Sequence, residues 1–162
     1  MNIHETAVVS PAVFIGEGTM VWVNVQIREN TQIGCQCVIS KDVYIDKNVV
    51  IGDRCKIQNS VSVYDGVTLG NDVFVGPNVA FTNDKVPRAF NQEWKITPTK
   101  IHDGVSLGAN ATIICGIEIG EFAMVAAGSV VTKNVPPYTL VVGNPARAVA
   151  QIDKAGNIVK RF

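Results

Sequence analysis

Ile33-Gly-Cys-Gln-Cys-Val-Ile39-Ser-Lys-Asp-Val-Tyr-Ile45-Asp-Lys-Asn-Val-Val-Ile51 decides the fold of this chain, because an isoleucine returns at every sixth residue. The spacing extends in both directions: every sixth residue from 3 to 81 is apolar, and the pattern resumes from 101 to 131. One hexad is too short to bury its own apolar side chain, so hexads must stack to make a core. Since β-branched residues favour an extended backbone, the period predicts an all-β chain whose short strands stack into a parallel β-helix.

Glycines recur along the same pattern at intervals of three hexads, at Gly16, Gly34, Gly52 and Gly70. Three hexads therefore make one coil, which predicts three short strands per coil and about six to seven coils. We expect these glycines at one corner of a triangular cross-section, where an unusual backbone angle is needed. The period does not determine the hand of the helix.

The length of 162 residues fits a single domain. Residues 1–136 are predicted to form the β-helix, and residues 137–162 leave the repeat after Pro136 and Pro137. Apolar pairs and a polar turn in this extension predict a last strand and a hairpin that cover the exposed coil edge. The N-terminal coil has no comparable cover.

The composition excludes several classes of protein. Fourteen basic residues balance 14 acidic ones, which argues against nucleic acid or an anionic membrane as partner. The first residues do not resemble a signal peptide, so we expect a cytoplasmic protein. The four cysteines lack zinc spacing, which predicts no metal site. Cys37 and Cys55 lie one coil apart, and we expect them to stack as reduced thiols.

The repeat is interrupted once. Twenty residues separate Phe81 from Ile101 where six would keep the phase, so 14 are inserted, and we expect a protruding loop at residues 85–100. Prolines make this loop a poor strand and a poor helix. A regular prism has flat faces, so the loop is the natural place for a site, although a passive surface bulge is the alternative. Arg88, Phe90 and Trp94 favour a site.

Residues one coil apart share one angular position, which places Asp65 directly below Asn83, with Asp84 adjacent. If the insertion is a pure loop of fourteen, Cys115 and Lys133 continue this column upward. These polar side chains at the root of the loop predict an acceptor site.

In the second block of hexads, small residues gather at another corner. Gly108 and Ala126 are one coil apart, and Ala127 and Gly128 follow. Small residues let an elongated ligand such as a pantetheine arm approach the backbone, although tight coil turns explain them equally well.

Several segments resemble a known family. The hexad pattern is similar to that of the hexapeptide-repeat acyltransferases, and this resemblance implies a left-handed β-helix, an exception to the right-handed crossover rule. Seven segments more specifically resemble the N-acetyltransferases of nucleotide-linked 3-amino sugars. They are Ile51-Gly-Asp-Arg-Cys-Lys-Ile-Gln-Asn59, Val61-Ser-Val-Tyr-Asp-Gly66, Phe74-Val-Gly-Pro77, Phe81-Thr-Asn-Asp84, Pro87-Arg88, Leu107-Gly-Ala-Asn-Ala-Thr112 and Val142-Gly-Asn-Pro-Ala-Arg147.

The resemblance implies acetyl-CoA as co-substrate, no metal, and a homotrimer with sites between subunits that serves the biosynthesis of lipopolysaccharide or another cell-surface polysaccharide. By the same resemblance, Asp65, Asn83 and Asp84 hold the amino sugar, together with Arg88 and Trp94 on the loop. The residues implied for coenzyme A follow the upper coils and the C-terminal segment: Gly108, Ala126, Ala127, Lys133, Pro145 and Arg147.

Two substrate classes stay open. The loop residues favour a dTDP-3-amino-3,6-dideoxyhexose, whereas a UDP-2-acetamido-3-amino-glucuronate would need a cation for its carboxylate, which Arg88 could supply. A sugar O-acetyltransferase or a 4-amino-sugar enzyme is the alternative within the family. A purely structural β-helix is the alternative outside it, because two histidines are too few for a zinc enzyme and no threonine array indicates an ice-binding face.

The chain has only His4 and His102. His4 lies in the first hexad, far from the loop, and His102 falls in the glycine column at the return of the loop, where we expect a structural or peripheral role. A neutral amine attacks a thioester directly, whereas a hydroxyl would need help with its proton. We therefore predict that Asn83 and Asp84 are the catalytic residues: Asn83 positions the amine, and Asp84 or the departing thiolate accepts the proton. A backbone N–H near Gly108 or Ala126 is the predicted oxyanion donor.

Overall fold

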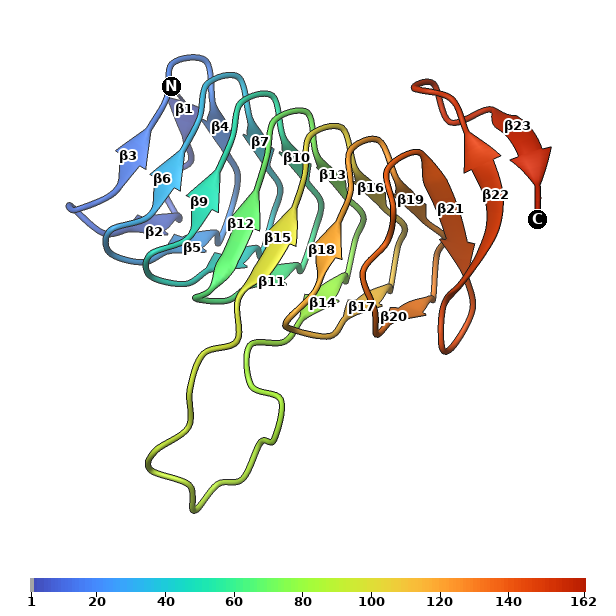
Figure 1. Cartoon of the computed structure of the whole chain (residues 1–162). Helices are drawn as coiled ribbons and strands as arrows, with labels where there is room; N and C mark the ends of the chain where they lie inside the picture. The colour runs from blue at the N-terminus through green and yellow to red at the C-terminus, as the bar shows by residue number, and fades with distance from the viewer. Residues whose placement is uncertain (1) are drawn as a thin grey trace.

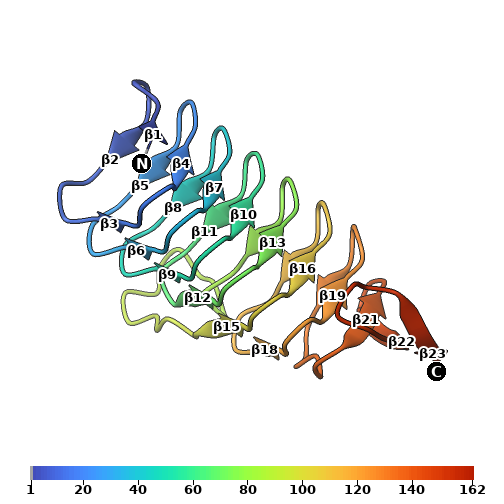
Figure 2. The same cartoon turned by 90° about the horizontal axis from the view of Figure 1, so that it is seen from above.

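A computed structural model describes residues 2–162, which form a three-sided parallel β-helix with no α-helix (Figure 1). The coils follow one another along a single axis, with the N-terminus at one end and the C-terminal hairpin at the other (Figure 2). Within these residues no helix is long and apolar enough to cross a membrane. The three sides are sheets of ten, seven and six strands.

The strands of each sheet come from successive coils. The ten-stranded sheet consists of β1 (Asn2–Ile3), β4 (Met20–Val21), β7 (Val38–Ile39), β10 (Lys56–Ile57), β13 (Phe74–Val75), β16 (Ser106–Leu107), β19 (Met124–Val125), β21 (Thr139–Val142), β22 (Arg147–Ile152) and β23 (Ile158–Arg161). The seven-stranded sheet consists of β2 (Val8–Val9), β5 (Gln26–Ile27), β8 (Tyr44–Ile45), β11 (Ser62–Val63), β14 (Ala80–Phe81), β17 (Thr112–Ile113) and β20 (Val130–Val131). The six-stranded sheet consists of β3 (Phe14–Ile15), β6 (Gln32–Ile33), β9 (Val50–Ile51), β12 (Val67–Leu69), β15 (Thr99–Ile101) and β18 (Glu118–Ile119).

The strand register confirms the predicted coil of three hexads. Lys56 pairs with Val38 below it and with Phe74 above it, and all these pairings are parallel. Across the loop, Val67 pairs with Thr99, whereas an uninterrupted coil would pair it with position 85. Since position 99 lies fourteen beyond position 85, the insertion has the predicted length and leaves the coils on either side in phase.

The core is a set of stacked apolar columns inside the prism. From Val21 onward the residues that set the period are buried; Ile33, Ile39, Ile45 and Ile57 have no exposed surface. Burying such a side chain stabilises the fold by about 1.5–3 kcal/mol. Cys37 and Cys55 lie in neighbouring rungs, as expected, and each thiol donates to a backbone carbonyl at 3.1 Å, while all four cysteines are free.

The role expected for the recurring glycines was wrong. None of Gly16, Gly34, Gly52 and Gly70 has a positive φ. They are required by space instead: a Cβ on Gly52 would lie 2.6 Å from the carbonyl carbon of Gly70 in the next coil. The left-handed conformation occurs two residues later and every six residues, as at Asn24, Asn30 and Asn48, because Asn and Asp tolerate it.

The expected number of coils was too low. Eight parallel strands stack in the ten-stranded sheet before β22, which corresponds to about eight turns. The difference arises after Pro136 and Pro137, where the chain does not leave the repeat at once. Val125 pairs with Val141, whereas a full coil would pair it with Gly143, so a last turn shorter by two residues adds β21 as a further parallel strand. Only then do β22 and β23 form the predicted antiparallel hairpin.

Candidate functional site

The inserted loop leaves the coil after β14 at the corner between the seven-stranded and six-stranded sheets and returns to β15 (Figure 1). Its base is closed by the backbone N–H of Thr97, which donates to the carbonyl of Asn83 at 2.8 Å. The side-chain amide of Asn83 donates to the carbonyl of Asp65, one rung below, at 3.2 Å. The predicted stacking of Asp65 and Asn83 is therefore confirmed, and it fixes the first residue of the site to the coil.

Two glycines of the coil leave space for the two arms of the loop. A Cβ on Gly66 would overlap the Ile96 side chain of the returning arm. A Cβ on Gly116 would lie 2.7 Å from Cε of Lys85, on the outgoing arm. Both glycines also have positive φ, 96° and 83°. The coil thus leaves room on either side of the insertion, and the base of the loop has a defined position.

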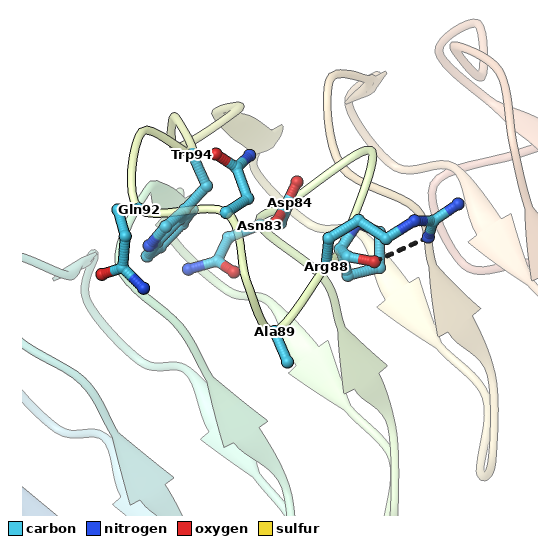
Figure 3. A pocket seen from close by; sticks show the side chains of 8 residues that line it. Asn83, Asp84, Arg88, Ala89, Gln92 and Trp94 are labelled. Atoms are coloured by element: carbon cyan, nitrogen blue, oxygen red, sulfur yellow. Dashed lines mark hydrogen bonds between the residues drawn. The ribbon is translucent and has the colours of Figure 1, made fainter.

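Residues of the loop line an open hollow of about 580 Å³ (Figure 3). It is lined by Asn83, Asp84, Pro87, Arg88, Ala89, Asn91, Gln92 and Trp94. The carboxylate of Asp84 accepts from the N–H of Val86 at 2.8 Å through Oδ1, which orients the group at the base. Arg88 donates to the carbonyl of Pro87 at 2.8 Å, and Trp94 and Gln92 lie across the hollow from it. The structure brings four of the five residues predicted for the sugar to this hollow.

Asp65 is the fifth predicted residue, and it does not line the hollow. Its Oδ2 accepts from the side-chain amide of Asn48 at 3.0 Å, in the rung below. Only its backbone carbonyl contacts Asn83. In this structure Asp65 therefore acts on the site through Asn83.

The residues predicted for pantetheine lie at a different corner, between the ten-stranded and seven-stranded sheets. Gly108 stacks directly on the next coil, because a Cβ on it would lie 2.8 Å from the carbonyl carbon of Ala126. Tight coil stacking is therefore sufficient to explain this glycine. Ala127 is exposed beside it.

The other predicted coenzyme A residues lie at the C-terminal end of the helix. Lys133 and Arg147 line one hollow of about 250 Å³. Pro145 belongs to a turn that is bonded to the last full coil: the N–H of Gly143 donates to Oγ of Ser129 at 3.0 Å, and the N–H of Ala146 donates to the carbonyl of Val130 at 2.8 Å. The turn thus packs against the coil that contains Ala126 and Lys133, and Arg147 follows the turn at the start of β22.

Within one chain, the structure does not unite the loop hollow with the pantetheine corner. The loop starts where strand β14 of the seven-stranded sheet ends. Gly108 and Ala126 lie at the opposite edge of that sheet, before strands β17 and β20 begin. A single copy therefore presents the two halves of the predicted site at separate corners.

His102 occupies the glycine column, as predicted, and its Nε2 lies 2.9 Å from Oε2 of Glu118. The hydrogen bond from His102 lowers the pKa of Glu118. Sequence reasoning missed Glu118, although it lies one coil above Lys100 and the register could have found it. It also missed Asn91 and Gln92 in the loop hollow, since an aperiodic segment carries no positional signal. In residues 2–162 no three His, Cys, Asp or Glu side chains converge as a metal site.

The chain is similar to known protein families in both sequence and fold. The model of the bacterial transferase hexapeptide, a unit of six repeats, matches residues 48–83 and 98–133, on either side of the loop. The chain therefore carries the hexapeptide repeat of this transferase family over 72 of its 162 residues. The β-helix also matches the left-handed β-helix fold of solved acetyltransferases, so the expected hand is confirmed.

Three relatives of this hexapeptide-repeat chain illustrate the likeness. The dTDP-3-amino-3,6-dideoxy-α-D-galactopyranose 3-N-acetyltransferase of Aneurinibacillus thermoaerophilus is 57% identical over 49 residues, which is 30% of this chain and 26% of that protein. A hexapeptide-repeat acetyltransferase of Vibrio cholerae, solved with acetyl coenzyme A, is 29% identical with a TM-score of 0.58, over 86% of this chain and 71% of that one. A variant of the perosamine N-acetyltransferase of Caulobacter crescentus, solved with CoA and GDP-perosamine, is 27% identical with a TM-score of 0.51, over 90% and 54%.

The chain spans only part of the curated relatives that it matches. The matched segments cover between 19% and 42% of their lengths.

Proposed function

We propose that the chain transfers the acetyl group of acetyl-CoA to the C3 amine of a nucleotide-linked amino sugar, a dTDP-3-amino-3,6-dideoxyhexose. The observation that carries this proposal is the hollow inside the inserted loop, with Asn83 and Asp84 at its base and Trp94 as a wall. A polar base beside an aromatic wall suits a sugar that carries an amine. The likeness to the 3-N-acetyltransferase of Aneurinibacillus thermoaerophilus supports the same substrate class.

The proposed reaction needs little from the protein beyond position and a proton acceptor. The neutral amine nitrogen forms a bond to the thioester carbonyl carbon, the carbon–sulfur bond breaks, and the amine loses one proton. Asp84 is held by Val86 through Oδ1, so Oδ2 is the atom that takes this proton. Asn83, whose amide is pinned to the Asp65 carbonyl, orients the amine.

The donor half of the site belongs to the same proposal. Coenzyme A binds along Gly108, Ala126 and Ala127, and its nucleotide end lies at Lys133, Pro145 and Arg147. Because one chain presents the two halves at separate corners, a neighbouring copy completes the site. We also propose the homotrimer and the cytoplasmic location that the sequence led us to expect.

The test is a panel of purified nucleotide sugars incubated with the chain and acetyl-CoA, with release of free coenzyme A thiol and product mass as readouts. We expect acetylation of dTDP-linked 3-amino sugars and none of the matching 3-hydroxy sugars. Acetylation of the hydroxyl analogue, or of no amino sugar, would refute the proposal.

A second substrate class is favoured by one observation, the position of Arg88 on the hollow. A guanidinium pairs well with a carboxylate, which UDP-2-acetamido-3-amino-glucuronate carries and a 6-deoxysugar lacks. Replacing Arg88 with Gln separates the two classes. For a deoxysugar enzyme the change leaves the sugar preference intact, whereas a glucuronate enzyme loses about tenfold or more in kcat/KM for the acid.

A further inference from the structure

A second hollow, of about 730 Å³, lies on the outer face of the six-stranded sheet beside the base of the loop. It is lined by Thr68, Lys85, Thr97, Pro98, Thr99, Lys100, Gly116, Ile117, Glu118 and Asn134. Sequence reasoning assigned none of these residues to a ligand. The hollow is open to solvent and mixes ammonium, hydroxyl and amide groups, which are the groups that bind oxyanions.

Two lysines supply its positive charge. Lys85 extends along Gly116, where the missing Cβ makes room for its ammonium end. Lys100 projects from β15, in register with Thr68 below and Glu118 above. Within residues 2–162 neither lysine forms an ion pair. Both ammonium groups are therefore available to an anion.

Glu118 is the one carboxylate on this hollow, and it is engaged by a neighbour. Its Oε2 lies 2.9 Å from Nε2 of His102, which does not line this hollow. Lys100 also lies next to it in the sheet. Two lysines and one carboxylate thus line the hollow, which leaves it an excess of one positive charge.

Hydroxyl groups complete the lining. Thr99 also lines the hollow, but it is 2% exposed and its Oγ1 is buried, so this hydroxyl is not accessible to a ligand. The accessible hydroxyls of the lining are those of Thr68 and Thr97. A ligand with several acceptor oxygens fits this surface better than an apolar one.

We infer that this hollow binds the diphosphate of a nucleotide substrate, with Lys85 and Lys100 as its cationic ligands. The inference rests on the proposed function and extends it. Asp84 lines the loop hollow and the next residue, Lys85, lines this one, so a ligand whose amino sugar occupies the loop has its diphosphate within reach of the lysines. Two phosphates match two ammonium groups.

The direct probe is inorganic pyrophosphate, measured by calorimetry on the full chain, because it reports the anion site whatever sugar the protein accepts. We expect Lys85→Gln and Lys100→Gln each to weaken pyrophosphate binding about tenfold, the loss of one charge-assisted contact. Lys95→Gln is the matched control, since Lys95 lies on the same loop and outside both hollows. It should bind pyrophosphate like the unchanged chain.

A second measurement identifies the source of the diphosphate. The KM values of a nucleotide sugar and of acetyl-CoA are compared in the same variants. A raised KM for the nucleotide sugar alone supports the inference, and a raised KM for acetyl-CoA alone assigns the diphosphate to coenzyme A. If pyrophosphate binds through the two lysines but no amino sugar is acetylated, the site stands and the proposed function fails. If amino sugars are acetylated while both lysine variants behave like Lys95→Gln, the inference fails and the proposed function stands.

Discussion

The coil and the loop differ in almost every physical respect. In the coil residues have equivalents in the neighbouring rungs, the apolar side chains that point into the prism are buried, and backbone hydrogen bonds join neighbouring rungs. The inserted segment has no equivalents, contains no strand, and exposes large apolar side chains such as Phe90, which is 81% exposed. Stability thus arises from repetition, and the candidate chemistry arises where repetition stops.

Truncating one residue of a core column should have the largest effect on the free energy of unfolding. Ile57→Ala removes a fully buried side chain between Ile39 and Val75, so it should lower the free energy of unfolding by about 2–5 kcal/mol. Urea titration measures this. Lys56→Ala, one residue earlier on the outer face, is the control and should change it by less than about 0.5 kcal/mol. Equal losses for both variants would mean that the stacked columns do not carry the stability.

A change at the base of the loop should affect turnover only. Asp84→Asn keeps the shape and the Val86 contact but cannot take a proton, so kcat for acetyl transfer should fall about 100-fold. The melting temperature should stay near that of the unchanged chain. Glu93→Gln, another acidic position on the same loop but outside the hollow, is the control. Full turnover by Asp84→Asn with the same pH dependence would exclude Asp84 as the base.

Periodicity explains which parts of this molecule could be predicted from its sequence. The contact of Asn83 with Asp65 followed from counting in coils, because every coil before the loop has the same length. The extra strand β21 was missed because Pro136 and Pro137 resemble an end of the repeat, whereas they accompany a turn shortened by two residues. The positions of Gln92 and Arg88 depend on the path of an aperiodic loop, which no spacing rule describes.

Alanine substitutions at two glycines of the coil test whether space or backbone angle requires glycine there. Gly34→Ala places a Cβ 2.6 Å from the carbonyl carbon of Gly52, so it should cost about 1–3 kcal/mol of stability through overpacking. Gly128→Ala meets no atom within 4 Å but has a φ of 70°, so it should cost only about 1 kcal/mol. Thermal unfolding of the two variants ranks them. A larger loss for Gly128→Ala would restore the original expectation that backbone angle is the constraint.

The smallest expected effect concerns the exposed pair of His102 and Glu118. Because the hydrogen bond from His102 lowers the pKa of Glu118, this pair stabilises the folded state above the unfolded pKa of glutamate, about 4.3, and the stabilisation is lost as the pH falls through the folded value. Glu118→Gln should therefore melt slightly earlier than the unchanged chain at pH 7, and the difference should vanish as the pH falls below the folded pKa of Glu118. A difference that grows on acidification would contradict this assignment.

Removal of the loop tests the division between coil and loop most directly. Deleting residues 84–97 joins Asn83 to residue 98 and restores the hexad phase, but the new corner falls at the position of Gly66 and Gly116, both with positive φ. Proline cannot adopt that angle, so the variant also carries Pro98→Gly. Its melting temperature and its acetylation of a dTDP-linked 3-amino sugar are then measured together. We predict a folded coil that melts near the unchanged chain and transfers no acetyl group. Acetylation at the original rate by the shortened, folded chain would contradict the account.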